Sequence, residues 1–199
     1  MFNRVAFWLR AGCVWSGVWA TPIVAEIVIE DFAAGSVSLN WEIVNDSVMG
    51  GVSTSRLDRV SDEVVRFRGQ LSLENNGGFA SVRATGRLPD LTGVQALVVR
   101  VKGDGRTYQL RLRTATGWRT PDYSAAFPTQ PDQWQTHMLP LTTFVAGWRG
   151  RTLRDAPPLD PTQIRSVGVL LGDKNPGAFA VELDWIKATN AAPKASKAD

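Results

Sequence analysis

The residues that could carry out catalysis are few, and the clearest pair is formed by two carboxylates near the end of the chain. Glu182 and Asp184 stand two positions apart in an alternating segment, so their side chains share one face of a strand. Such neighbours lie about 7 Å apart, a spacing compatible with the acid and base of an inverting glycosidase. A solvated sheet face explains the same pattern more simply. A hydrolase that uses this pair, or Asp46, is therefore the minor hypothesis.

Metal-ligating side chains are also scarce. His137 is the single histidine and Cys13 the single cysteine, so the sequence predicts no nitrogen- and sulfur-ligated zinc site. A calcium site would need carboxylates such as Glu30, Asp31 and Asp184, brought together by pairing of the terminal strands. No calcium-loop spacing supports such a site, and we predict neither a metal nor another cofactor.

The segment WEIVNDSVMGGVS, residues 41–53, combines a polar turn with a methionine and two glycines. Side chains such as Asn45 and Asp46 can accept hydrogen bonds from nearby backbone, and Gly50-Gly51 permits a positive φ or a close approach. In a structural interpretation Met49 folds inward over the end of the core. In a functional interpretation Asn45, Asp46 and Met49 form an exposed contact tip. The residue types favour the structural interpretation, and the contact tip is kept as the alternative.

Aromatic and basic residues supply further candidates for binding. Trp118, Tyr123 and Trp148 fall in loop-like segments, where exposed rings would stack on sugars or anchor a protein interface. Arg111 and Arg113 lie on the polar phase of a strand. Two other strands carry similar basic pairs, and together they would form a cationic sheet face for an acidic partner or an anionic glycan. The alternative is a solvated face with compensating carboxylates. The basic pairs are Arg66 with Arg68, Arg100 with Lys102, and Arg111 with Arg113.

The first 25 residues read as a secretory signal peptide. Arg4 and Arg10 precede the uncharged run AGCVWSGVWATPIVA, and no acidic residue occurs before Glu26. The run is shorter than a membrane span needs, so no span is predicted once the leader is removed. Removal leaves 20 of the 22 basic residues against 19 acidic ones, a balance that does not indicate nucleic-acid binding. It also removes Cys13. The leader predicts a periplasmic or secreted protein, with a mitochondrial location as the alternative.

The segments that must position these residues are short, alternating and separated by Gly- and Pro-rich turns, which indicates an all-β sandwich or jelly roll. Hydrophobic content is 44%, enough for a core. We expect a domain over residues 26–188, a long surface loop over 144–161, and a disordered tail over 189–199. The roughly ten expected strands are Glu26–Phe32, Trp41–Val44, Val52–Leu57, Val64–Leu73, Phe79–Ala84, Val94–Lys102, Arg106–Thr114, Trp134–Leu139, Ile164–Leu171 and Ala178–Lys187.

Four motifs resemble the complex I intermediate-associated protein 30 family. They are WEIVNDSVMGGVSTSRL, FRGQLSLENNGGFASVRA, VRVKGDGRTYQLRLRT and the late WQTHMLPLTTF…WRGR…IRSVGVLLGDKNPGAFAVELDWI, in family order from about Asp31 to Ile186. The resemblance implies that certain residues are signature positions of the family, and it attaches no catalytic role to them. The signature positions are Trp41, Asn45, Asp46, Val48, Met49, Gly50, Gly51, Ser53, Gly69, Gly77, Gly78, Phe79, Gly103, Asp104, Gly105 and Tyr108.

The resemblance implies a galactose-binding-like jelly roll and a non-enzymatic role in assembling a membrane respiratory complex through protein contacts. Relatives of that fold often bind carbohydrate through loops at one end of the sandwich. The resemblance therefore implies a protein partner, with a cell-envelope carbohydrate-binding module as the alternative.

Overall fold

The computed structural model describes residues 25–33, 35, 39–114, 120–148 and 150–191, and within these the chain is built from two antiparallel sheets. The predicted leader, Cys13, Trp118 and most of the predicted tail lie outside the described residues. The first sheet has the order β3-β4-β13-β6-β9, with β1 also pairing with β13. Its strands are β1 Glu26–Glu30, β3 Thr54–Arg59, β4 Val65–Leu71, β6 Ala96–Lys102, β9 Trp134–Pro140 and β13 Gly177–Thr189.

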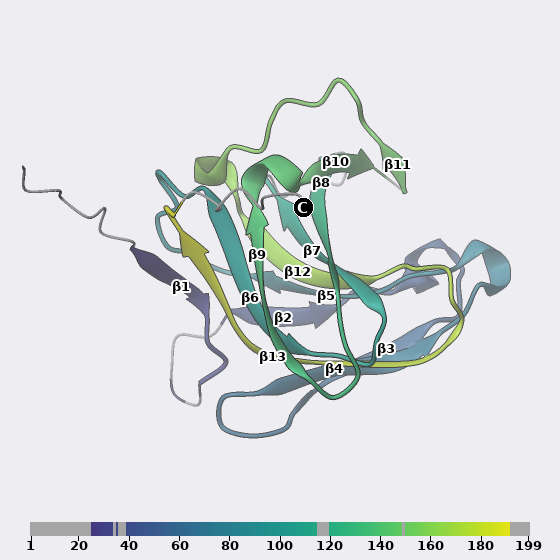
Figure 1. Cartoon of the computed structure of the whole chain (residues 1–199). Helices are drawn as coiled ribbons and strands as arrows, with labels where there is room; N and C mark the ends of the chain where they lie inside the picture. The colour runs from purple at the N-terminus through teal and green to yellow at the C-terminus, as the bar shows by residue number, and fades with distance from the viewer. Residues whose placement is uncertain (1–24, 34, 36–38, 115–119, 149, 192–199) are drawn as a thin grey trace, which may run out of the picture.

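The second sheet has seven strands in the order β11-β10-β8-β7-β12-β5-β2. Figure 1 shows β10 and β11 along the upper side of the molecule and β3 and β4 along the lower side. The strands of this sheet are β2 Asn40–Ile43, β5 Ala80–Thr85, β7 Thr107–Arg113, β8 Asp122–Pro128, β10 Val145–Trp148, β11 Arg151–Thr152 and β12 Ser166–Leu171. Four 3-10 turns connect the strands: η1 Asp46–Met49, η2 Glu74–Asn76, η3 Leu141–Thr143 and η4 Pro161–Gln163.

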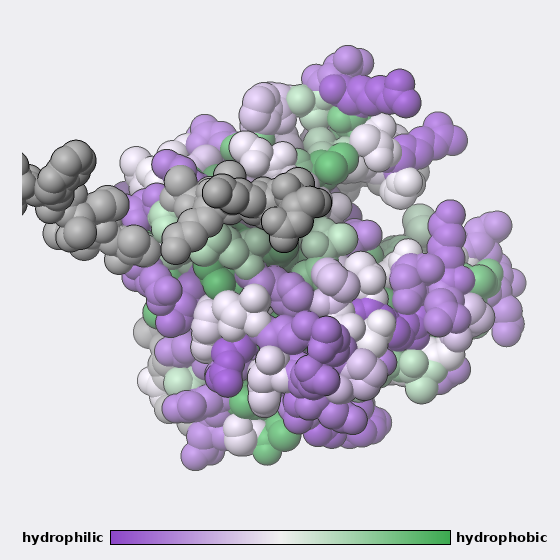
Figure 2. Space-filling view, viewed as in Figure 1, coloured by the Kyte–Doolittle hydropathy of each residue, from purple (hydrophilic) through white to green (hydrophobic). Residues whose placement is uncertain are grey.

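The core lies between the two sheets, and the period-two pattern of the sequence decides which side chains enter it. Buried side chains alternate with polar ones because successive residues of a strand point to opposite faces. The predicted inward sets on β6 and β7 are confirmed, with exposures of 0–1%. On the face seen in Figure 2, polar residues cover most of the surface and apolar residues form small separate groups. The inward sets on β6 and β7 are Leu97, Val99, Val101, Tyr108, Leu110 and Leu112.

The terminal strands are joined to the rest of the domain by a buried carboxylate. Glu30 is 3% exposed and accepts hydrogen bonds from the backbone N–H groups of Phe32 and Leu39, at 3.0 and 2.9 Å. It also accepts the indole N–H of Trp41 at 2.9 Å. These bonds explain why Trp41 occupies a signature position, since its ring holds the first strand of one sheet to the first strand of the other.

The all-β prediction is confirmed, but three strands were missed. Residues 122–128 form β8, where Tyr123, Ala125 and Phe127 point into the core. The alanine in the middle weakens the hydrophobic signal of this strand. The predicted long loop over 144–161 is wrong in its first part, because residues 145–148 and 151–152 pair as β10 and β11.

A β-bulge in β13 determines where Trp185 points. Strict alternation from Leu183 would place Trp185 in the core, but the pairing with β6 shifts between these two residues. Ile186 is consequently the fully buried residue, whereas Trp185 is half-buried with Lys187 Nζ 4.5 Å from its ring centroid.

Among the described residues, no helix has the length and apolar character that crossing a membrane requires.

Candidate functional site

The first candidate region is the turn around Asp46, which follows β2 and begins η1. Asp46 is completely buried, and its carboxylate accepts hydrogen bonds from two segments that are distant in sequence. Oδ1 accepts the backbone N–H of Ser53 at 3.0 Å, and Oδ2 accepts the Ser53 hydroxyl at 2.5 Å. Oδ2 also accepts the N–H groups of Gly78 and Phe79, at 2.7 and 3.3 Å. We call these four residues the Asp46 node.

The neighbouring Asn45 extends this network between the sheets. Its side-chain oxygen accepts the hydroxyl of Ser55 in β3 at 2.7 Å and the N–H of Ser81 in β5 at 3.4 Å. β3 belongs to the six-stranded sheet and β5 to the seven-stranded sheet. Asn45 and Asp46 therefore join the two layers at one end of the sandwich, and they are not exposed contact residues.

The electrostatics of Asp46 suit a structural anion. Burial raises the pKa of this carboxyl, but the hydrogen bonds from Ser53, Gly78 and Phe79 outweigh it and lower the pKa below its ordinary value. A general acid needs a raised pKa and access to substrate. Asp46 has neither, which removes the physical basis for a hydrolase that uses it.

The residues that follow Asp46 point outward instead. Val48 is 69% exposed, Met49 55% and Val52 46%, and we call these three residues the apolar tip. The expectation that Met49 folds over the core is wrong. Asp46 accepts four hydrogen bonds, which fix the short turn and prevent it from rotating to bury the methionine. The loop therefore has a polar base and an apolar end.

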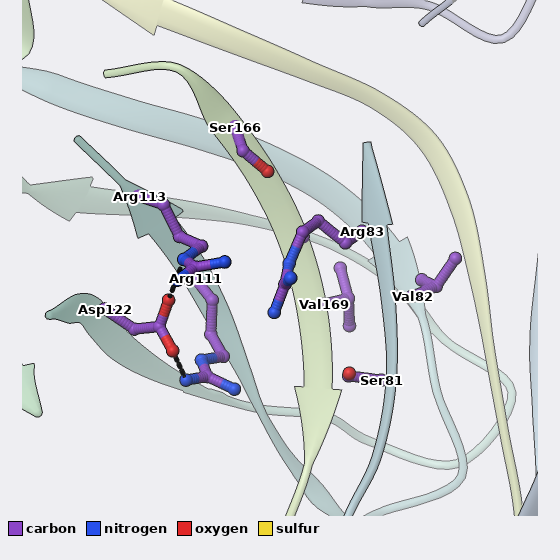
Figure 3. Close-up of a pocket in the computed structure, with 9 residues that line it drawn as sticks. Ser81, Val82, Arg83, Arg111, Arg113, Asp122, Ser166 and Val169 are labelled. Carbon is purple, nitrogen blue, oxygen red and sulfur yellow. Dashed lines mark hydrogen bonds and ion pairs between the residues drawn. The ribbon is translucent and has the colours of Figure 1, made fainter. Parts of the chain in front are cut away.

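The second candidate region is a recess on the outer face of the seven-stranded sheet. Arg83 on β5 lies opposite Gly168 on β12, and Gly168 lies opposite Arg111 on β7. Figure 3 shows Arg83 extending across β12 towards Arg111 and Arg113, while Asp122 lies beside the latter two. The sequence analysis did not single out Arg83.

Asp122 is shared between two of these arginines. It accepts a hydrogen bond from Arg111 and forms an ion pair with Arg113 Nε at 2.9 Å. The side chains of Arg113 and Asp122 are only 16% and 17% exposed. Arg83 makes no ion pair or side-chain hydrogen bond with the described part of the chain. Burial, and then the positive charge of Arg113, lower the pKa of the Arg83 guanidinium.

Comparison with known proteins decides the family. A family model described as "Complex I intermediate-associated protein 30 (CIA30)" matches residues 30–183, which include the whole Asp46 node and the recess. The chain belongs to the CIA30 family.

Curated CIA30 relatives share the domain at low identity. "Complex I intermediate-associated protein 30, mitochondrial" of Drosophila melanogaster is 25% identical over 182 residues, which cover 80% of this chain and 61% of that protein. The Mus musculus protein of the same name is 32% identical over 101 residues, or 49% of this chain and 31% of that protein. The matched regions thus span less than two thirds of the length of these relatives.

Solved structures with the same fold include carbohydrate-binding modules. The family 11 module of the cellulosomal cellulase Lic26A-Cel5E of Clostridium thermocellum has a TM-score of 0.62 at 15% identity, covering 86% of this chain and 98% of that one. The family 30 module of the C. thermocellum cellulase Cel9D-Cel44B has a TM-score of 0.54 at 15% identity, covering 85% and 99%. At this identity the likeness shows that the CIA30 domain has the jelly-roll fold and nothing more.

The third CIA30 motif, Gly103-Asp104-Gly105 with Tyr108, is also structural. Asp104 Oδ2 accepts the hydroxyl of Tyr108 at 3.0 Å and the backbone N–H of Ala180 at 2.8 Å. A Cβ at Gly103 would lie 2.3 Å from Thr129 Oγ1, so only glycine fits there. This motif closes the β6–β7 connection against β13.

The two aromatic candidates that the structure describes differ in exposure. Tyr123 is 4% exposed and donates its hydroxyl to the Pro157 carbonyl at 2.9 Å, so it belongs to the core. Trp148 lies half-buried on β10, and Trp118 is outside the described residues. Trp134, which was predicted only as the start of a strand, is 38% exposed. The Cζ atom of Arg100 lies 5.0 Å from the centroid of its ring.

The predicted cationic face is divided between the two sheets. On the six-stranded sheet the basic residues are neutralised: Arg66 and Lys102 both pair with Glu182, at 2.5 and 2.7 Å, and Arg100 pairs with Asp184. Arg111 and Arg113 lie on the other sheet and combine with Arg83. A single continuous cationic face is therefore wrong, and the basic cluster is smaller than predicted.

The same ion pairs bear on the carboxylate hypothesis. Burial raises the pKa of Glu182, but Lys102 and Arg66 outweigh it and lower the pKa below its ordinary value. An inverting acid would need the opposite shift.

His137 is half-buried with its ring 5.5 Å from that of Phe127, and burial lowers its pKa. Within the described residues no three metal-ligating side chains of the His, Cys, Asp or Glu type gather, although β1 and β13 do pair as the calcium hypothesis required.

Proposed function

We propose that this CIA30 domain is a non-enzymatic binding domain that assists assembly of a membrane respiratory complex through protein contacts. The apolar tip is the observation that carries the proposal. Val48, Met49 and Val52 place apolar side chains in solvent from a single short turn, which is a feature of protein-contact sites rather than of isolated folding units. The name of the Drosophila and mouse relatives supports the assembly role.

The base beneath the tip supports the same proposal. Ordering a flexible loop costs free energy on binding, and a loop that is already held loses less. The Asp46 node fixes both ends of the turn, since Ser53 lies directly after it and Gly78 and Phe79 lie on the opposite loop. Met49 itself has an unbranched side chain that adapts to irregular partner surfaces. A rigid base with an adaptable end favours binding over catalysis.

A carbohydrate-binding module of the cell envelope is the second candidate. The fold of the solved structures favours it. The burial of Tyr123 weighs against it, because this ring cannot then serve in a sugar-stacking platform. A glycan array on the purified protein separates the two candidates. Saturable binding to neutral β-glucans would favour the carbohydrate-binding module. No glycan binding, together with protein binding that depends on the apolar tip, would favour the assembly role.

The compartment bears on both candidates. The predicted leader supports a periplasmic or secreted location, whereas the two curated relatives are mitochondrial. We propose the extracytoplasmic location on the basis of the leader. Fractionation of source cells, with N-terminal sequencing of the recovered protein, tests this. A mature protein that begins near Glu26 in the periplasmic or medium fraction supports it, and an uncleaved protein in the cytosol contradicts it.

The assembly role is tested by removing the apolar character of the tip. In a strain that lacks the gene, a copy carrying Val48→Ser and Met49→Ser is expected to restore the membrane respiratory complex poorly, while the wild-type copy restores it. Affinity for the partner recovered with the wild type should fall about tenfold or more, the effect of losing an interface anchor. Native gel electrophoresis of the respiratory complex and a binding titration measure the two effects.

A matched control keeps this test specific. Val60→Ser changes a valine that is 45% exposed at the other end of β3, so it alters surface apolarity without touching the tip. Both variants should melt within a few degrees of the wild type because exposed substitutions change stability little. Normal assembly with the doubly substituted tip would contradict the proposed contact surface.

A further inference from the structure

The recess on the seven-stranded sheet contains more positive charge than the fold neutralises. Three guanidinium groups, those of Arg83, Arg111 and Arg113, line it together with one carboxylate, Asp122. Asp122 is already engaged by Arg111 and Arg113. Glu42 lies opposite Arg83 in the β2–β5 register, but Glu42 is exposed and forms no ion pair with Arg83 among the described residues. The local charge is therefore positive by about two units when all groups are ionised.

We propose that this recess is a binding site for the oxyanion group of a small molecule, a carboxylate or a phosphate, with Arg83 as its principal contact. The proposal does not depend on the apolar tip or on the assembly role. Arginine presents a planar fork of N–H donors that matches carboxylate and phosphate oxygens in pairs. Because Arg83 has no partner in the described part of the chain, its fork is available for such a contact.

The other lining groups restrict which chemistry can be recognised. The hydroxyl of Ser81 donates to the Val44 carbonyl, and that of Ser166 donates to the Ala84 carbonyl at 2.7 Å. Both hydroxyl protons are thus committed to backbone acceptors. Within the described part of the chain, the donors that remain available are the guanidinium N–H groups of Arg83, so a negatively charged acceptor is favoured over a neutral sugar hydroxyl.

The floor of the recess is kept open by a glycine. Gly168 separates Arg83 from Arg111 in the register of the sheet, and a Cβ built there would lie 2.6 Å from the Val82 carbonyl oxygen. The glycine lets the neighbouring strands stay close and leaves no side chain between the guanidinium groups. The recess is shallow, with enclosed room for about one water-sized group, so only the charged end of a ligand could enter it.

Electrostatics also favours an added anion. Burial and the nearby Arg113 both disfavour the charged form of Arg83, as the lowered pKa records. An oxyanion between Arg83 and Arg111 would replace the water that burial removes and offset the repulsion. Ionisable groups whose pKa values are perturbed by burial and by neighbouring charges occur at functional sites more often than elsewhere.

The test is a titration of the whole protein followed through the arginine side-chain N–H resonances. Inorganic phosphate and glucuronate are the probes, glucose is the neutral control, and chloride keeps the ionic strength constant. We expect saturable shifts of the Arg83 and Arg111 signals with phosphate, glucuronate or both, and none with glucose. Saturation by glucuronate alone identifies a carboxylate ligand such as an acidic sugar, and saturation by phosphate alone identifies a phosphate ligand. Shifts that grow linearly, no faster than with chloride, overturn the proposal.

Two substitutions localise the site. Arg83→Gln removes the charge and the fork, and it should weaken binding at least about tenfold, as expected for losing a charge-assisted contact. Arg83→Lys retains the charge and serves if the glutamine variant fails to fold, and it should weaken binding by a smaller factor. Arg154→Gln is the matched control because Arg154 is exposed and outside the recess. Equal affinity in wild type and a folded Arg83 variant contradicts the assignment.

Discussion

Replacing Asp46 with alanine is expected to lower the free energy of unfolding by about 3–5 kcal/mol, the range found when one partner of a buried charged network is removed. The carboxylate is fully buried and accepts bonds from the Ser53 N–H and hydroxyl and from the N–H groups of Gly78 and Phe79. Alanine leaves the backbone N–H groups of Ser53, Gly78 and Phe79 without this acceptor in a place that water cannot easily reach, whereas the Ser53 hydroxyl can still donate to the Ser72 carbonyl. Each unsatisfied buried donor costs about 1–3 kcal/mol.

Urea denaturation followed by tryptophan fluorescence measures this loss. Asp90→Ala is the matched control, since exposed Asp90 bonds only to its neighbour Thr92 at 2.9 and 2.7 Å and should change stability by less than about 1 kcal/mol. A loss below about 1 kcal/mol for Asp46→Ala would show that the node is replaceable. Asp46 would then return to the group of candidate contact residues.

The same node gives the stability a defined pH dependence. The folded pKa of Asp46 lies below its value in the unfolded chain, about 3.9, because the hydrogen bonds outweigh the effect of burial. The stabilisation is therefore fully present above about pH 3.9 and is lost as the pH falls through the lower, folded pKa. The difference in stability between wild type and Asp46→Asn should be large at pH 7 and should shrink on acidification. A constant difference down to pH 2.5 would contradict the charged node.

The strands with strict alternation were predictable because their own residues determine the buried face. In β6 and β7, Leu and Val occupy every second position, and the structure buries them as expected. β8 was missed because its inward set includes Ala125, which reads as neutral. β10 and β11 were missed because Gly147 and two arginines dominate that stretch. β10 is a strand because it pairs with β8, and β11 because it pairs with β10, and no local sequence pattern shows either pairing.

The candidate sites were less predictable because both depend on contacts distant in sequence. The donors to Asp46 include Gly78 and Phe79, which lie 32 and 33 residues away. Arg83 could be placed on the polar phase of its strand, but its proximity to Arg111 requires β12 to lie between β5 and β7. Composition and spacing cannot supply a strand order. The family motifs include all four residues of the Asp46 node but could not show which of them are buried.

The two glycines of the loop are expected to differ in mechanism and in size of effect. The sequence indicated a positive φ or a close approach at these two glycines, and each of them shows one of the two. Gly50 has φ +92°, and a Cβ added there would meet no atom within 4 Å. Backbone strain is therefore the whole cost of a side chain at this position, and Gly50→Ala should lower the free energy of unfolding by about 1–2 kcal/mol. Gly51 does not have a positive φ. A Cβ there would lie 2.4 Å from Asp46 Cγ, so strain is the wrong explanation for this position.

Gly51→Ala should therefore act through Asp46, and lose about 3–4 kcal/mol by combining overpacking with broken bonds of the node. A double-mutant cycle distinguishes this from strain. In an Asp46→Gly background the atoms that a new Cβ would meet are absent, so Gly51→Ala should cost less than about 1 kcal/mol there, whereas Gly50→Ala should cost the same in both backgrounds. Urea melts of the single and double variants give the coupling energy. An additive result, with the same loss for Gly51→Ala in both backgrounds, would contradict a cost that acts through Asp46 and would indicate backbone strain at Gly51 instead.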